Sequence, residues 1–125
     1  MYFKKNCKLK NFGVIISDST CAPLREGVHG IAIGYAGFEG IEDCRSKKDI
    51  YGQKIHVTKR AVADGLADAA LLVMGETDEK KPFALIRNAP VTFSNKNVRY
   101  KKMPLKSDLF FGIYNRKFKK FISKN

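Results

Sequence analysis

The stretch VIISDSTCAPLREGVHGIAIGYAGFEG, residues 14–40, decides the fold. An apolar, β-branched run at residues 13–17 predicts a short strand that is buried on both faces. Residues 17–26 then predict a polar loop, in which Pro23 marks the turn. Residues 30–38 predict a second strand. The stretch therefore places one carboxylate, Asp18, at the end of a strand, beside the hydroxyls of Ser19 and Thr20.

The second predicted strand alternates large and small residues. Ile31, Ile33 and Tyr35 alternate with small residues at positions 32, 34 and 36. Since side chains along a strand point to opposite faces, one face is bulky and the other is nearly bare. A bare face allows close approach by another backbone or by a ligand.

The rest of the chain predicts one long helix among short strands. Apolar residues at helical spacing, together with several alanines and leucines, predict a helix over residues 60–74, with Thr58 as its cap and Gly75 as its end. Shorter patterns predict a loop over 39–53, strands over 54–58, 83–87 and 90–93, and a basic aromatic helix over 108–122. The fold class is α+β, with short mixed or antiparallel strands.

Length and composition predict one domain without a membrane segment. The chain has 125 residues, no apolar run long enough to cross a bilayer and no secretory h-region after Met1. Its three cysteines are widely spaced and form no CxxC pair, which predicts neither a zinc site nor a disulfide framework. We therefore expect a cytoplasmic protein.

The net charge of +12 is concentrated at the two ends of the chain. Residues 1–10 carry +4 and residues 96–125 carry +9, whereas residues 11–95 are close to neutral. We divide the chain into a domain over 1–95 and a basic aromatic segment over 96–125. The segment suggests either a nucleic-acid surface or a solvated or packed basic end, and we favour the second.

Three places in the sequence carry groups that suit a phosphate or metal site. Asp18 and Ser19 supply hard oxygen atoms of the kind that Mg²⁺ or Mn²⁺ binds, although on these residues alone we favour an Asx or Ser turn at the strand end. Arg25 offers a planar fork to phosphate. Glu76, Asp78 and Glu79 follow the end of the long helix, where the helix dipole favours cations, so either solvent screening or a bound metal is required.

Other polar residues predict no catalytic group. The acids Glu42, Asp43 and Asp49 either orient an amine substrate or solvate their loop, and the sequence leaves both open. His29 and His56 have no nucleophile or ligand at motif spacing and are interpreted as structural. The chain contains no GxxxxGK[ST] motif, which excludes a P-loop as the phosphate cradle.

Residues 12–87 resemble the coenzyme F420-0:γ-glutamyl ligase family. The motifs are SDS followed by PLR and a glycine, then AIGYAGF, DIYG, AVADGLADAALLVMGETDE and a strand that ends in Ile-Arg. The branch that the chain resembles most is a putative folate-metabolism γ-glutamate ligase. Its C-terminus is loosely similar to DLFFGIYNRKFKKF at residues 108–121.

The resemblance implies a GTP-dependent ligase that joins L-glutamate to an F420-0-like or folate-like carboxylate through an acyl phosphate. It implies Mg²⁺ or Mn²⁺ together with K⁺, and an intertwined homodimer. Asp18, Ser19 and Glu76 match metal-binding positions. Residues 74–81 match the segment that contacts the nucleotide, and the nucleotide-binding residues are then Arg25, Met74, Gly75, Glu76, Thr77 and Asp78. No catalytic residue is assigned.

The resemblance covers only the C-terminal portion of the family fold. Family members are about twice as long, and their N-terminal half carries further nucleotide contacts and an Asp-x-x-Asn metal motif that this chain lacks. Three hypotheses follow: a ligase completed by a separate chain, a non-catalytic dimeric remnant of the fold, and a basic nucleic-acid-binding module.

Overall fold

The computed structural model describes residues 5–6, 8–95, 103–104, 107–108 and 110. Its elements are listed in chain order: β1 (Val14–Cys21), β2 (Val28–Ala36), β3 (Ile41–Asp43), β4 (Lys59–Ala61) and α2 (Val62–Met74). β1 pairs with β2, and β3 pairs with β4, both antiparallel. The α+β class predicted from the sequence, with short antiparallel strands and one long helix, is confirmed.

The β1–β2 hairpin is longer than predicted and has an irregular register. The loop expected at 17–26 is shorter, because residues 17–21 continue β1 and place Asp18 inside the strand, opposite Ile31. The pairing passes from Ile16 and Gly34 directly to Ser17 and Ala32, so Ile33 is an extra residue in β2. Such a bulge reverses which side chains face the core, and the predicted alternation ends there.

The prediction that the first strand is buried on both faces is wrong. Ile16 is 61% exposed, and Ile33 on the neighbouring strand is exposed to the same extent. A strand is buried on both faces only when other layers cover both sides of its sheet. In the part of the chain that the structure describes, this sheet has two strands, and its main packing partner is α2.

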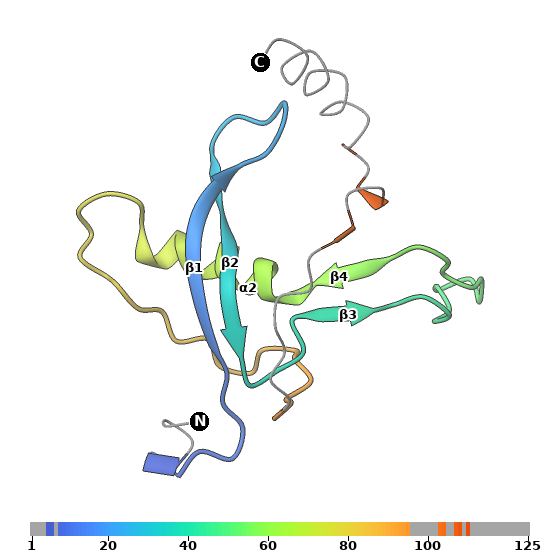
Figure 1. Cartoon of the computed structure of the whole chain (residues 1–125), viewed down its shortest axis with the longest axis horizontal. Coiled ribbons are helices and arrows are strands. Elements are labelled where there is room, and N and C mark those ends of the chain that lie inside the picture. The colour runs from blue at the N-terminus through green and yellow to red at the C-terminus, as the bar shows by residue number, and fades with distance from the viewer. Residues whose placement is uncertain (1–4, 7, 96–102, 105–106, 109, 111–125) are drawn as a thin grey trace, which may run out of the picture.

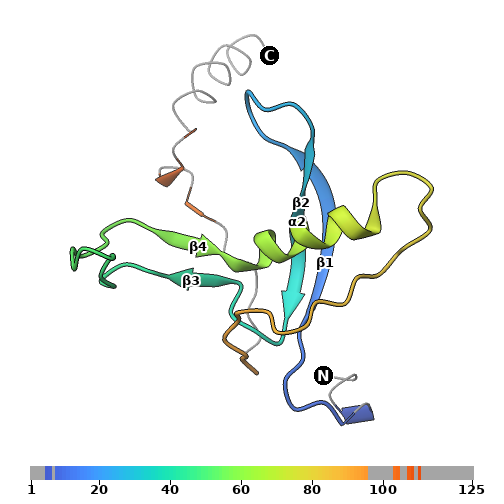
Figure 2. The same ribbon diagram turned by 180° about the vertical axis from the view of Figure 1, so that it is seen from behind.

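Helix α2 packs against β2 and closes the edge of the sheet that faces away from β1. Asp68 Oδ1 accepts a hydrogen bond of 2.8 Å from the Gly30 N–H, and Asp64 Oδ1 accepts one of 3.1 Å from the Ala32 N–H. Both N–H groups belong to the outer edge of β2, where no strand pairs with them. Figures 1 and 2 show that the helix crosses one face of the hairpin, behind both strands in the first view and in front of them in the second. The aspartates thus take the place of a third strand.

The helix approaches β2 closely at Gly30 and Ala32, and of the face predicted to be bare (Ala32, Gly34 and Ala36) only Ala32 lies beneath it. A Cβ atom added to Gly30 would lie 2.6 Å from the carbonyl oxygen of Ala67, and Ala32 is buried beneath the helix. Glycine at position 30 therefore sets the distance between helix and strand.

Gly30→Val is expected to destabilise the chain by about 1–3 kcal/mol, because helix and strand must separate to make room for the side chain. Gly34→Val is the matched control, since an added Cβ there has no neighbour within 4 Å. Urea denaturation monitored by circular dichroism measures both free energies of unfolding. Equal stability of the two variants would contradict the close approach at Gly30.

The β3–β4 pair forms an arm that projects from the hairpin and helix (Figure 1). Beyond the paired residues the arm continues with an isolated bridge between Lys48 and Lys54. The strand predicted over 54–58 is therefore wrong, because pairing resumes only at Lys59, and β3 lies within the predicted loop 39–53. The Asp49 carboxylate orders the tip by accepting the Tyr51 and Gln53 N–H groups, at 2.9 and 2.8 Å.

Helix α2 begins and ends almost where its sequence pattern predicts. Gly75 ends it with φ +83° and donates its N–H to the Leu71 carbonyl oxygen at 2.8 Å, which confirms the predicted stop. The cap prediction is wrong: Ala61 occupies the cap position and makes no side-chain capping bond. Thr58 lies too early because β4 leads directly into the helix.

The core of the described residues is small. Its buried hydrophobic members are Ala32, Phe38, Ala63 and Ala67. Residues 62 and 66 pack against it as expected, but Val73 of the predicted apolar face is exposed because nothing in the described part covers the last turn. No helix of the described residues has the length and apolar character needed to cross a membrane.

The segment that follows α2 departs most from prediction. The strand expected over 83–87 is absent, because these residues have no pairing partner. Of the strand expected over 90–93, a single bridge between Phe93 and Phe38 forms. The helix predicted over 108–122, apart from residues 108 and 110, lies outside the described residues, as does most of the basic segment 96–125.

Candidate functional site

Asp18 and Ser19 lie on β1 at the edge that faces away from β2. The Asp18 side chain is exposed, and its Oδ1 atom accepts the Ser19 N–H at 2.8 Å. Ser19 lies opposite Gly30, whose own N–H points to α2, so the Ser19 N–H belongs to the unpaired edge of β1. The carboxylate thus covers one free donor of that edge and keeps its other oxygen atom towards solvent.

The predicted nucleotide segment forms the end of α2 and the bend after it. Glu76, Thr77 and Asp78 are exposed, and Met74 and Gly75 are partly buried. Glu79 organises the bend, since its Oε2 accepts the Thr77 N–H at 2.8 Å and the Thr77 hydroxyl at 3.2 Å. Both hydrogen bonds lower the pKa of Glu79 below its usual value, and the bond from the Thr77 backbone N–H has the larger effect. Of the three acids in this segment, Glu79 is hydrogen-bonded within the bend, whereas the exposed Glu76 and Asp78 remain available to a ligand.

Arg25 is exposed in the loop that joins β1 to β2. Its N–H donates to the Ala22 carbonyl oxygen at 3.3 Å, and its side chain extends into solvent. Among the described residues, no hydrogen bond or ion pair joins Arg25, Asp18 or Glu76 to one another. Within the same residues no three His, Cys, Asp or Glu side chains lie close enough to hold a metal ion together. The predicted site residues thus have known positions in the described structure, but they do not form one site there.

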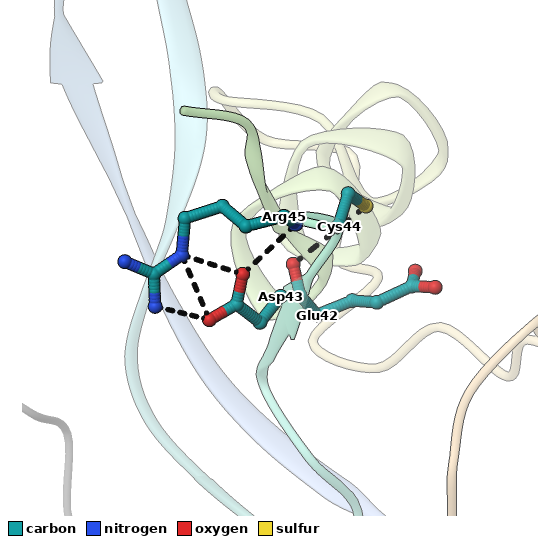
Figure 3. Close-up of polar contacts among 4 residues, drawn as sticks. All are labelled: Glu42, Asp43, Cys44 and Arg45. Carbon is teal, nitrogen blue, oxygen red and sulfur yellow. Dashed lines mark hydrogen bonds and ion pairs between the residues drawn. The ribbon is translucent and has the colours of Figure 1, made fainter. Parts of the chain in front are cut away.

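The acids left open by the sequence are engaged within the arm. Glu42 pairs with both Lys47 and Arg60, and Asp43 pairs with Arg45 through three hydrogen bonds to the guanidinium and one to the Arg45 N–H (Figure 3). The hydrogen bond from Lys47, followed by Arg60, lowers the pKa of Glu42. These contacts support a structural role for Glu42 and Asp43 in holding the arm.

Arg45→Gln is expected to raise the pKa of Asp43 towards its ordinary value of 3.8, because the Arg45 side chain is the main cause of its depression in the folded chain. A carboxylate with a depressed folded pKa adds stability above its unfolded pKa and loses it as the pH falls through the folded pKa. The Asp43–Arg45 ion pair therefore stabilises the folded chain fully at about pH 4 and above. The contribution is small because both side chains are exposed to solvent.

Carboxyl ¹³C NMR titration of Asp43 measures this shift. Lys47→Gln is the control, because Lys47 donates to Glu42. This variant therefore keeps the contact between Asp43 and the Arg45 guanidinium. An unchanged Asp43 pKa in Arg45→Gln would contradict the assignment.

Two residues with a clear role escaped the sequence reasoning. Asp64 and Asp68 lie one turn apart on α2 and bind the backbone of β2. The available signal was the combination of two acids at i and i+4 on a helix with a strand whose face is bare. Sequence spacing alone shows that the two acids share a helix face, but not that the face meets a strand edge.

A shallow depression of about 380 Å³ lies at the base of the arm. It is lined by Glu39, Ile41, Glu42, Arg60, Val62, Ala89, Pro90, Val91 and Thr92. None of the residues predicted for the metal or nucleotide lines it. The depression is therefore separate from the predicted site.

Comparison with known proteins identifies relatives. The family model described as F420-0:Gamma-glutamyl ligase matches residues 3–88. A protein of Methanocaldococcus jannaschii named coenzyme F420:L-glutamate ligase is 45% identical over 101 residues, which cover 81% of this chain and 41% of that protein. Proteins of the same name match from Methanococcus maripaludis strain C7, at 45% over 86 residues, and Methanothermobacter thermautotrophicus, at 47% over 81 residues.

The matched part covers most of this chain but less than half of each relative. It amounts to 41%, 35% and 32% of the three relatives' own lengths. The match includes β1, β2, the arm, α2 and the segment up to residue 88. The hairpin with Asp18 and the helix that ends at Gly75 are thus elements of a shared fold, and the chain belongs to the F420-0:gamma-glutamyl ligase family.

Proposed function

We propose that this chain carries part of the site of a GTP-dependent γ-glutamyl ligase. The acceptor carboxylate would take the γ-phosphoryl group of GTP and release GDP. The amine of L-glutamate would then attack the acyl phosphate, form an amide bond and release phosphate. The observation that carries the proposal is the family match over residues 3–88, together with relatives that are named coenzyme F420:L-glutamate ligase. An F420-0-like acceptor is supported by those names, and a folate-like acceptor is the alternative.

The donor set of the chain suits a divalent cation held with phosphate. Asp18 and Glu76 each offer an exposed carboxylate, and Ser19 offers a hydroxyl. Mg²⁺ and Mn²⁺ take hard oxygen ligands, and a site that binds phosphate commonly uses only one or two protein carboxylates. Such an ion, when bound, neutralises charge on the transferring phosphoryl group.

The residues of the chain have separate tasks in this proposal. Asp18 and Ser19 hold the metal from the edge of β1, and Glu76 approaches from the end of α2. Arg25 and residues 74–78 hold the nucleotide phosphates, with K⁺ as a further cofactor. A homodimer, or a second polypeptide that carries the rest of the family fold, would complete the site.

Isothermal titration of the chain with GTP tests the proposal, in the presence of Mn²⁺ and K⁺ and again with Mn²⁺ omitted. We expect binding heat only when Mn²⁺ is present. Absence of heat under both conditions, for this chain alone and with a complementing polypeptide, would contradict the proposal.

A non-catalytic dimeric remnant of the fold is the second candidate. It is favoured by one observation: no three potential metal-ligating side chains lie close together among the described residues. It predicts a folded dimer whose melting temperature does not respond to GTP and Mn²⁺. A rise in that temperature would contradict it, since a ligand that binds only the native state stabilises it. The third hypothesis, nucleic-acid binding, depends on segment 96–125, which is largely outside the described residues.

A further inference from the structure

Segment 82–88 has a strand-forming sequence but no partner. It reads PFALIRN, with the large apolar residues Phe83, Leu85 and Ile86. No turn or bend is assigned over residues 79–87, and the residues with positive φ are Lys80, before the segment, and Asn88, its last residue. Figure 1 shows the chain leaving α2 in a wide loop and returning below the hairpin.

The backbone of segment 82–88 makes no hydrogen bond to any part of the chain that the structure describes, and no other polar contact of these residues is recorded. Phe83 is 88% exposed and Leu85 is 72% exposed. These two residues are two positions apart, so in an extended chain they lie on one face. Strand preference reflects packing on a pleated surface and is realised only when a neighbouring strand is present.

The described residues offer this segment no covered position. The outer edge of β2 is closed by Asp64 and Asp68, and the neighbouring residues 89–93 are tied to Phe38 and Glu39 at the end of β2. The small core described above leaves no buried apolar site for Phe83 and Leu85. The part of the chain that the structure describes therefore contains no partner strand for segment 82–88.

We propose that segment 82–88 adds as a strand to the edge of a sheet supplied by a polypeptide that carries the rest of the family fold. The segment lies inside the matched residues 3–88, so the relatives contain it too. Those relatives have more than half of their length outside the matched part, which is enough to supply a sheet. Main-chain hydrogen bonds give the affinity in this mode of binding, and alternate side chains such as Phe83 and Leu85 give the specificity.

The test co-expresses this chain with a tagged form of the Methanocaldococcus jannaschii relative from which the matched 101 residues are deleted. We expect a complex of the two polypeptides. Within it, hydrogen exchange of amides 83–87 is expected to slow by about tenfold or more relative to the chain alone. Failure of the two to co-purify, or a complex in which these amides exchange as fast as in the free chain, would overturn the proposal. A homodimer of this chain with protected amides 83–87 would also overturn it, because the partner would then be a second copy.

Two proline variants locate the paired edge. Leu85→Pro and Ile86→Pro each remove one N–H, and successive N–H groups of a strand point to opposite edges. We expect the affinity of at least one variant for the partner to fall by about tenfold or more. If both variants bind the partner as tightly as the wild type does, the proposal is overturned. Neither substitution removes a hydrogen bond from the free chain, so both free variants should keep the wild-type melting temperature. A clear fall would show that the segment already has partners within the chain, which would also overturn the proposal.

The proposal rests on the proposed function and deepens it by naming how the rest of the family fold would attach to these residues, but its readouts need no substrate. A complex with protected amides and no ligase activity would refute the function alone. Mn²⁺-dependent GTP binding without such a complex would refute the strand pairing alone.

Discussion

Replacing Asp64 and Asp68 together with alanine is expected to lower the free energy of unfolding by about 3–6 kcal/mol, since each loss leaves a β2 N–H without its charged acceptor. Gly30 and Ala32, whose N–H groups donate these bonds, are buried against α2. Because natural domains have stabilities of about 5–15 kcal/mol, this loss is enough to unfold much of the population.

Urea denaturation followed by circular dichroism measures the effect. The control is Asp64→Asn with Asp68→Asn, because an amide oxygen still accepts the N–H groups and only the charge is lost. We expect the asparagine pair to retain most of the stability. If the alanine pair unfolds within about 1 kcal/mol of the wild type, helix carboxylates do not close the edge of β2. The two positions are neighbours, so their effects need not add.

Asp18→Ala is expected to weaken Mn²⁺-dependent GTP binding by about 100-fold or more under the proposed function. Loss of groups that merely orient metal ligands costs about 10–100-fold in affinity, and a direct ligand costs at least as much. Its effect on folding should be small, because the Asp18 carboxylate is exposed and its recorded hydrogen bond is to the adjacent N–H.

Isothermal titration with GTP and Mn²⁺ measures this prediction. Glu26→Ala is the matched control, as it removes one exposed acid from the same hairpin and lies outside the proposed ligand set. Equal affinities of the Asp18 and Glu26 variants would argue against a metal at β1. A loss confined to Asp18→Ala, with an unchanged melting temperature, would support the ligand assignment.

Local pattern was enough to predict the helix and the presence of the two hairpin strands, although β1 extends further than predicted. α2 lies within two residues of the range expected from its apolar spacing, and Gly75 ends it as predicted. β2 was placed within two residues at each end. The motifs around Asp18 and Glu76 also led to the family, which the comparisons confirm. These features depend on residues close together in the chain, so sequence alone contains them.

The local sequence pattern could not predict contacts between residues that are far apart in the chain. The bonds from Gly30 to Asp68 and from Ala32 to Asp64 join residues 38 and 32 positions apart. Nothing in the helix sequence states which strand edge it will meet. The bulge at Ile33 and the exposure of Ile16 likewise depend on what covers the sheet.

Segment 83–87 shows most clearly the difference between what the local sequence predicts and what the tertiary structure decides. Its sequence determined a preference for the extended state, and the tertiary structure decided that no strand forms within the described chain. A helix satisfies its own backbone, whereas a strand needs a second strand beside it. The sequence by itself therefore determined α2, the hairpin and the family. The tertiary structure decided that Asp64 and Asp68 close one sheet edge and that segment 82–88 is left without a partner.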